Sequence, residues 1–259
     1  MNRLLVFAVS ASALFAQLPA PNQSGVSMGH VHLLVADPEA QKNVWMEALG
    51  AELTHVGSLD LLRLPGVFVV VGKARTAPTQ GSEGSTVNHL GFAVRDLAAV
   101  KAKLDALRVE STPVNATQIL AMFPENVMVE LTEDAALPTA VAMHYIQLAT
   151  PDPEKLQAWY VKIFGARAGT RGRFLAAFIP GGELDADKTS VAQAPTRGRS
   201  LDHIGFEVKN LEAFCKQFEA AGGRLESPFQ DMPQMGLKWA FVVDPAGTRI
   251  ELTEGFAGR

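Results

Sequence analysis

The stretch LDHIGFEV, residues Leu201–Val208, decides how this chain is organised, because a near copy, VNHLGFAV, occupies residues Val87–Val94. Both stretches alternate core-type residues with other residues, a pattern typical of a β-strand with one buried face. The shift between the copies, which places His203 on His89, is 114 residues. Similarity at a fixed spacing indicates a repeated structural unit.

The same shift relates a second pair of strands. It places His144 of MHYIQLA on His30 of GHVHLLV, and 59 residues separate His30 from His89 as they separate His144 from His203. A glutamate closes each half, Glu130 in VMVELTE and Glu251 in RIELTE. We therefore expect four modules in two pairs, with one domain over residues 28–134 and a second over residues 140–256.

Each module shows the same order of elements, a strand, a helix and three strands. Asp37-Pro38 in module one and Asp152-Pro153 in module three have the residue types that cap a helix and begin its first turn. We expect Trp45 and Trp159 to lie on these two equivalent helices, packed against their sheets. The predicted fold is α+β, with four βαβββ modules forming two cupped mixed-sheet domains joined by a linker at residues 134–139.

Composition favours a small-molecule ligand. The 259 residues are 47% apolar, and the net charge of -4 comes from interspersed charges of both signs. No basic surface for nucleic acid or for an anionic membrane is expected. The oligomeric state stays open, with a homodimer as the candidate assembly. Cys215 is the only cysteine, so an internal disulfide is excluded, and its helical spacing with apolar residues predicts a core position.

The amino terminus has the pattern of a secretory signal peptide. A basic Arg3 precedes an apolar run that ends near Ala16, and a proline-containing linker covers residues 17–27. The run is shorter than the roughly 20 residues of a membrane-spanning helix. We expect residues 1–16 to be removed and the mature protein to be exported, either periplasmic or secreted.

The repeated histidines and glutamates have the residue types of metal ligands. Alternate strand residues share a face, so His203 and Glu251 are expected on the open face of the sheet while their neighbours pack inward. Two imidazoles and a carboxylate form a three-ligand set that suits Fe(II), Mn(II), Ni(II) or Zn(II). The alternative is that repetition copied a structural histidine, which leaves one or both sites unused.

Two ligand sets follow from the predicted pairing. The preferred set lies in the second half, where the closing hairpin is complete and polar side chains are frequent. It consists of His144, His203 and Glu251, with Tyr145, Gln147, Arg173, Glu207 and Lys238 as polar neighbours without assigned roles. The other set lies in the first half and consists of His30, His89 and Glu130.

These motifs resemble those of the vicinal oxygen chelate superfamily, which includes glyoxalase I, bleomycin-resistance proteins and extradiol dioxygenases. HVHLLVAD resembles its metal-bearing first strand, NHLGFAV and DHIGFEV the second, and DPAGTRIELTE its closing hairpin with the ligand glutamate. The resemblance covers about 230 residues of the chain. It implies paired modules that fold an eight-stranded cupped sheet around one metal per pair.

Departures from the family pattern leave the chemistry open. Ring-cleaving dioxygenases have a tyrosine on the strand before the ligand glutamate, where this chain has Phe241, and no histidine follows His203. One hypothesis is an exported metal-dependent enzyme with lyase, isomerase or dioxygenase chemistry on a small oxygenated substrate. The alternative is an exported binding protein of the bleomycin-resistance type that sequesters a small molecule without catalysis.

Overall fold

A computed structural model describes residues 18–78 and 80–259. The predicted signal peptide, residues 1–16, lies outside the described residues. The elements of the amino-terminal half are β1 (Val26–Val35), α1 (Pro38–Leu49), β2 (Glu52–Val56), β3 (Leu59–Leu64), β4 (Val67–Lys73), β5 (Val87–Val94), α2 (Leu97–Ala106), β6 (Glu110–Asn115), β7 (Gln118–Phe123), η1 (Pro124–Asn126) and β8 (Val127–Glu133). Those of the carboxy-terminal half are β9 (Val141–Thr150), α3 (Pro153–Phe164), β10 (Arg167–Arg171), β11 (Phe174–Ile179), β12 (Gly182–Lys188), β13 (Leu201–Val208), α4 (Leu211–Ala220), β14 (Ser227–Met232), β15 (Leu237–Val243) and β16 (Arg249–Glu254).

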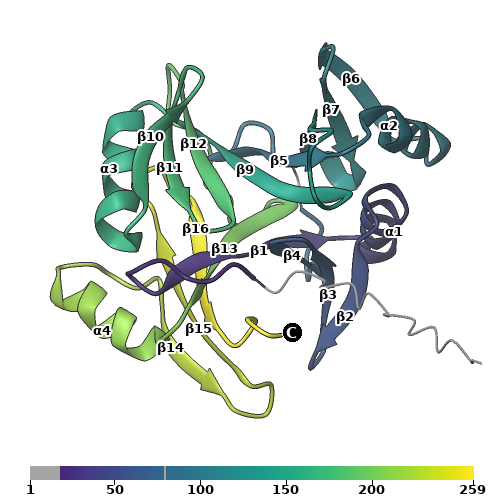
Figure 1. Cartoon of the computed structure of the whole chain (residues 1–259). Coiled ribbons are helices and arrows are strands. Elements are labelled where there is room, and N and C mark those ends of the chain that lie inside the picture. Colours follow the sequence, from purple (N-terminus) through teal and green to yellow (C-terminus); the bar gives the residue numbers. More distant parts are fainter. Residues whose placement is uncertain (1–17, 79) are drawn as a thin grey trace, which may run out of the picture.

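The strands form two mixed eight-stranded sheets, which confirms the predicted fold class. Sheet A has the order β14-β15-β16-β13-β1-β4-β3-β2, and sheet C has the order β10-β11-β12-β9-β5-β8-β7-β6. At the centre of each sheet two long strands from different modules run antiparallel, β1 with β13 and β5 with β9. Figure 1 shows sheet C above sheet A, with the outer strands of sheet C curving upward and those of sheet A curving downward.

The pairing of the modules differs from the prediction. Sheet A joins the first module to the fourth, and sheet C joins the second to the third, so the prediction that each half of the chain forms its own sheet is wrong. The connections give the physical reason. The short segment 134–140 turns the chain from β8 into β9 within one sheet, whereas the longer segments 74–86 and 189–200 cross between sheets. The two crossing segments are bonded to each other, since Ser85 bridges Ala194.

An irregularity in the pairing of the central strands shifts one predicted residue equivalence between the two sheets by one position. In sheet A, His30 pairs with Gly205 after an irregularity that leaves Gly29 unpaired, and in sheet C, Tyr145 pairs with Gly91 beside a similar irregularity at His144. A bulge leaves one residue without a partner and reorients those beside it. The structural counterpart of His30 is therefore Tyr145, and the predicted equivalence with His144 is wrong.

The helices begin where the sequence places their caps. The side chain of Asp37 accepts a hydrogen bond from the backbone of Ala40, and that of Asp152 accepts one from Lys155. The helices cover the convex faces, α1 against α2 and α3 next to α4 (Figure 1). Trp45 and Trp159 lie on these equivalent helices and pack against the core, as predicted, and the residue of α3 at the place of Trp45 is Tyr160.

One apolar cluster runs through both sheets and beneath all four helices, so the two sheets share a core. Tyr160 of α3 extends it into sheet A, where its hydroxyl donates a hydrogen bond of 2.9 Å to the buried carboxylate of Asp244. Cys215 is buried in this core, as its spacing indicated. Among the described residues, no helix has the length and apolar character needed to cross a membrane.

Candidate metal centre

Four potential metal ligands converge on the concave face of sheet A. In the described part of the chain, His30, His32, His203 and Glu251 form a group whose ligand atoms all lie within 4.8 Å of one another. The first two come from β1, the third from β13 and the last from β16, which are adjacent strands. The register places them together, because His32 pairs with His203 and Gly205 pairs with Glu251.

The glutamate joins two of the histidines directly. Its Oε2 lies 2.9 Å from Nε2 of His30 and 3.1 Å from Nε2 of His203. His32 lies against His203, with ring centroids 4.5 Å apart. His30 is fully buried and His203 almost so, so their rings are held by packing on both sides.

The donor spacing fits a shared divalent ion. Two ligand atoms that each lie about 2.1 Å from one ion are about 3 Å apart when they subtend a right angle. The distances from Glu251 to His30 and His203 are of this size. Imidazole and carboxylate are ligands that iron, manganese, nickel and zinc accept. The four side chains therefore have both the chemistry and the proximity of a metal site.

Protonation of the site follows from burial and contact. Burial raises the pKa of Glu251, but hydrogen bonds from His203 and His30 outweigh burial and hold that pKa well below its usual range. Burial disfavours the imidazolium of His203, yet its bonds to Asp202 and Glu251 raise its pKa. His32 is the opposite case, since burial and then the charge of His203 lower its pKa to about 3. An ionised carboxylate and a neutral imidazole are the forms that bind metal.

A second layer of contacts fixes His203. Its Nδ1 donates a 2.7 Å hydrogen bond to Asp202, which also accepts a 2.9 Å bond from Arg249. The guanidinium of Arg249 lies 3.7 Å above the ring of Phe241, and this ring meets His203 edge-on. A carboxylate behind a ligand histidine sets the orientation of its ring. Phe241 thus supports the ring of His203 from β15.

A small cavity opens beside the four donors. It measures about 260 Å³, and His32 and Glu251 form part of its wall. The other lining residues come from β3, β4, β14, β15, β16 and the turns near them, and most are apolar: Ser58, Leu59, Val70, Met232, Met235, Leu237, Lys238, Trp239, Thr253 and Phe256. A molecule bound there would contact the metal donors at one end and apolar side chains over the rest of its surface.

The predicted ligand sets are only partly brought together. His203 and Glu251 meet as predicted, but their third partner is His30 of the first half, while His144 lies in sheet C at the bulge. Its Nε2 is 3.9 Å from Glu183, not near the two predicted partners. The first-half set is divided in the same way: His89 and Glu130 lie 3.9 Å apart in sheet C, and His30 is in sheet A.

Neither of the two predicted ligand sets includes His32. The signal was present, because the motif HVH places two histidines at alternate positions of one strand and alternate side chains share a face.

Comparisons with known proteins support the family resemblance. Residues 142–252 match the model of the Glyoxalase/Bleomycin resistance protein/Dioxygenase superfamily. The solved structure of glyoxalase I from Zea mays is 18% identical, covers 89% of this chain and 92% of its own, and superposes with a TM-score of 0.68. A dioxygenase-like protein of Bacillus subtilis is 16% identical, with coverages of 94% and 88% and a TM-score of 0.69. No curated protein matches the chain. The structural likeness establishes the shared fold over most of the chain.

Proposed function

We propose that this chain, a member of the glyoxalase/bleomycin resistance/dioxygenase superfamily, is a divalent-metal-dependent enzyme that acts on a small oxygen-bearing organic molecule. The observation that carries the proposal is the convergence of His30, His32, His203 and Glu251 beside a cavity whose wall includes His32 and Glu251. A set of clustered donors with a cavity beside it is the arrangement of a catalytic metal site rather than of a closed structural one.

The four donors would hold Fe(II), Mn(II), Ni(II) or Zn(II). Bound there, the metal would supply a Lewis acid that polarises adjacent oxygen atoms of a substrate, as lyase, isomerase and dioxygenase reactions of such molecules require. Asp202 keeps the ring of His203 turned toward the site through its 2.7 Å hydrogen bond. His32 and Glu251 are donors that also line the cavity, so a substrate would meet the metal on their side.

The cavity walls determine what fits beside the metal. Trp239, Met235, Leu59 and Phe256 provide an apolar enclosure that holds a hydrocarbon or aromatic body and excludes water. Lys238 also lines the cavity but is paired with Glu254 at 2.7 Å, so its charge is already balanced. The volume of about 260 Å³ favours a small, largely apolar substrate whose oxygens lie at one end.

Metal analysis of the purified full chain tests the proposal. We expect near-stoichiometric divalent metal, and turnover of a catechol or a 2-oxoaldehyde that EDTA abolishes and added metal restores. The Glu251→Gln protein should lose both metal and turnover while remaining folded. A wild-type protein that stays metal-free after incubation with each of the four metals would contradict the proposal.

The apolar walls also suit the second candidate, a protein that captures an aromatic compound without converting it. Tight binding of a catechol, measured by calorimetry in the absence of any product, would favour this candidate over the enzyme.

Export of the chain is also proposed. It is supported by the sequence of residues 1–16, with Arg3 before the apolar run. Amino-terminal sequencing of the protein from its native cell should find a start near Gln17 in a fraction outside the cytoplasm. Recovery of intact Met1 from the cytosol would oppose export.

A further inference from the structure

Sheet C repeats the cup of sheet A with different side chains at its floor. The register that places two histidines of β1 in sheet A places Tyr145 and Gln147 of β9 at the same positions in sheet C. The other two positions keep their residue types, as His89 and Glu130. Two of the four donors of the metal centre are therefore replaced by a phenol and an amide.

The contacts of these four residues disfavour a metal. Burial raises the pKa of Tyr145, which keeps its hydroxyl protonated, and this hydroxyl donates to Nε2 of His89 at 3.0 Å. Nδ1 of His89 donates to Asn88 at 2.8 Å, so both ring nitrogens are engaged. The guanidinium of Arg171 lies 3.7 Å above the ring of Tyr145 and places a positive charge beside the site. The phenol stays protonated and both nitrogens of the imidazole are engaged, so these residues are not free to bind a metal as the donors of sheet A are.

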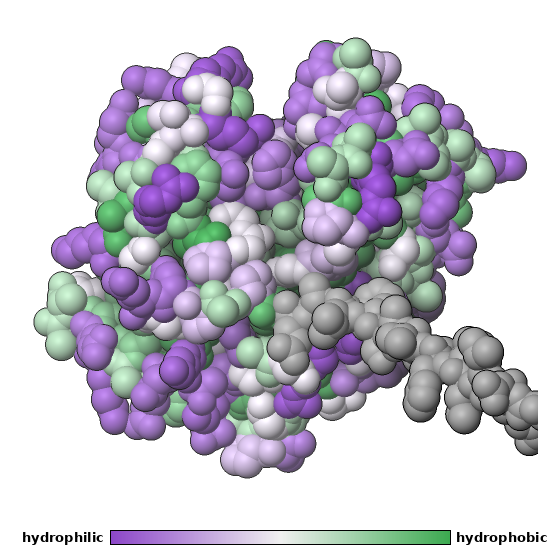
Figure 2. All heavy atoms as spheres, viewed as in Figure 1, coloured by the Kyte–Doolittle hydropathy of each residue, from purple (hydrophilic) through white to green (hydrophobic). Residues whose placement is uncertain are grey.

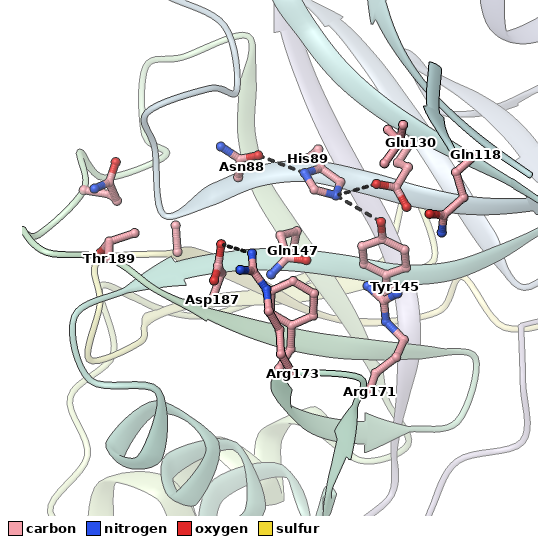
Figure 3. Close-up of a pocket in the computed structure, with 14 residues that line it drawn as sticks. Asn88, His89, Gln118, Glu130, Tyr145, Gln147, Arg171, Arg173, Asp187 and Thr189 are labelled. Atoms are coloured by element: carbon pink, nitrogen blue, oxygen red, sulfur yellow. Dashed lines mark hydrogen bonds and ion pairs between the residues drawn. The ribbon is translucent and has the colours of Figure 1, made fainter. Parts of the chain in front are cut away.

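The cup nevertheless encloses a cavity of about 400 Å³, larger than the one beside the metal donors. Figure 2 shows the surface hollowed between the arm of β10–β12 and the arm of β6–β8, and Figure 3 shows polar side chains from both arms and from the floor facing this space. Both hydrogen-bond donors and acceptors line it, including Asn88, Gln118, Glu130, Gln147, Arg173 and Asp187.

Two carboxylates, Glu130 and Asp187, and two arginines, Arg171 and Arg173, line the cavity, so the charges of its wall sum to zero. Arg171 is hydrogen-bonded to the buried Asp185 and lies 3.7 Å from Glu183. Arg173 lies 3.6 Å from Asp187. Neither arginine is left as an unpaired cation, so the cavity has no surplus charge to select an anion.

Apolar groups cover the rest of the wall. Phe174 and Val114 face the cavity from opposite arms, and Ala149 lies between them on β9. A ligand that satisfies the whole wall needs several groups that both donate and accept, one apolar face and no net charge. Hydroxyl groups meet the first requirement, since each donates one hydrogen bond and accepts two.

We propose that the cup of sheet C is a metal-independent binding site for a neutral, hydroxyl-rich organic molecule of the size of a monosaccharide or disaccharide. The ligand's hydroxyls bond to Glu130, Gln118 and Asp187, and its C–H face rests on Phe174. The volume lies in the range of natural small-molecule sites. This site is separate from the metal centre, which lies in the other sheet.

Calorimetry with the full chain tests the proposal. The probes are glucose, galactose, mannose, N-acetylglucosamine and maltose, with glucuronate and glucosamine as charged counterparts, each with and without EDTA. We expect saturable binding of at least one neutral sugar, unchanged by EDTA. The isosteric Glu130→Gln variant should weaken this binding about tenfold or more, because a hydrogen bond to a carboxylate is stronger than one to an amide. Phe174→Ala should weaken it through loss of the apolar face.

The matched control is Glu251→Gln in sheet A, which should retain sugar binding. Thermal unfolding establishes that each variant is folded, and if Phe174→Ala is not, the isosteric Glu130→Gln decides. The proposal is overturned if no neutral sugar binds, if only the charged counterparts bind, if binding requires metal, or if Glu130→Gln binds as well as wild type.

Discussion

The imidazole of His30 and the phenol ring of Tyr145 occupy equivalent places in the two sheets, and each packs against the backbone of a glycine on the neighbouring strand. A Cβ added to Gly205 would overlap the ring of His30, and one added to Gly91 would overlap the ring of Tyr145. Glycine is required at both positions because the ring crosses the strand where a side chain would begin.

Gly205→Ala should therefore displace His30 and weaken metal binding about tenfold or more, since a site tolerates only about 0.5 Å of ligand displacement. The measurement is a competition titration of Zn(II) against a chelating dye. Gly91→Ala is the matched control. Both variants should lose roughly 1–3 kcal/mol of stability from overpacking, but Gly91→Ala should bind metal like wild type. Equal metal affinity in all three proteins would contradict the assignment of His30 as a ligand.

The assignment of the metal to sheet A leads to a second prediction. His203→Ala should lose the metal, because it removes a donor bonded directly to Glu251. His89→Ala and His144→Ala should keep it, because both residues lie in sheet C. Elemental analysis of the three proteins prepared side by side provides the comparison. Loss of metal from the His144→Ala protein would instead support the ligand set predicted from the sequence of the second half.

Spectroscopy can establish whether His32 is the fourth metal ligand. With His30, His32 and His203 as ligands, X-ray absorption of the Co(II)- or Ni(II)-loaded protein should show three imidazoles. His32→Ala should show two and bind the metal about tenfold more weakly, while Glu251 remains coordinated. Three imidazoles in the His32→Ala protein, or two in wild type, would show that His32 lines the cavity without binding the metal.

Much of the fold could be predicted from the sequence because each module repeats one order of elements. The pairing of modules could not be obtained from the repeat, since the 59-residue spacing within each half is the same whichever modules combine. Connection length carries that information. Segment 134–140 is too short to leave the sheet, so β9 lies beside β5, while segments 74–86 and 189–200 are long enough to cross.

The one-residue error in the first strand also had a visible signal. The histidines His30 and His144 are 114 residues apart, but the helix caps Asp37 and Asp152 are 115 apart. Alignment on the caps places His30 on Tyr145, as the structure does. Alignment by residue type instead places His30 on His144. No sequence feature marks the bulge at His144.

The last prediction concerns pH and the cup of sheet C. Burial, and then the charge of Arg171, lower the pKa of His89 from 6.5 to about 4, so between these values the unfolded chain binds a proton that the folded chain does not. The stability that neutral His89 contributes is complete above about pH 6.5 and falls as the pH drops toward 4, by an amount on the order of 3 kcal/mol. His89→Gln removes the titrating group, so the free energy of unfolding should vary less with pH over this interval. Urea titrations of both proteins at pH 4.5, 5.5 and 7 measure the difference. Parallel profiles would show that His89 titrates alike in the folded and unfolded chains, and that burial does not hold it neutral.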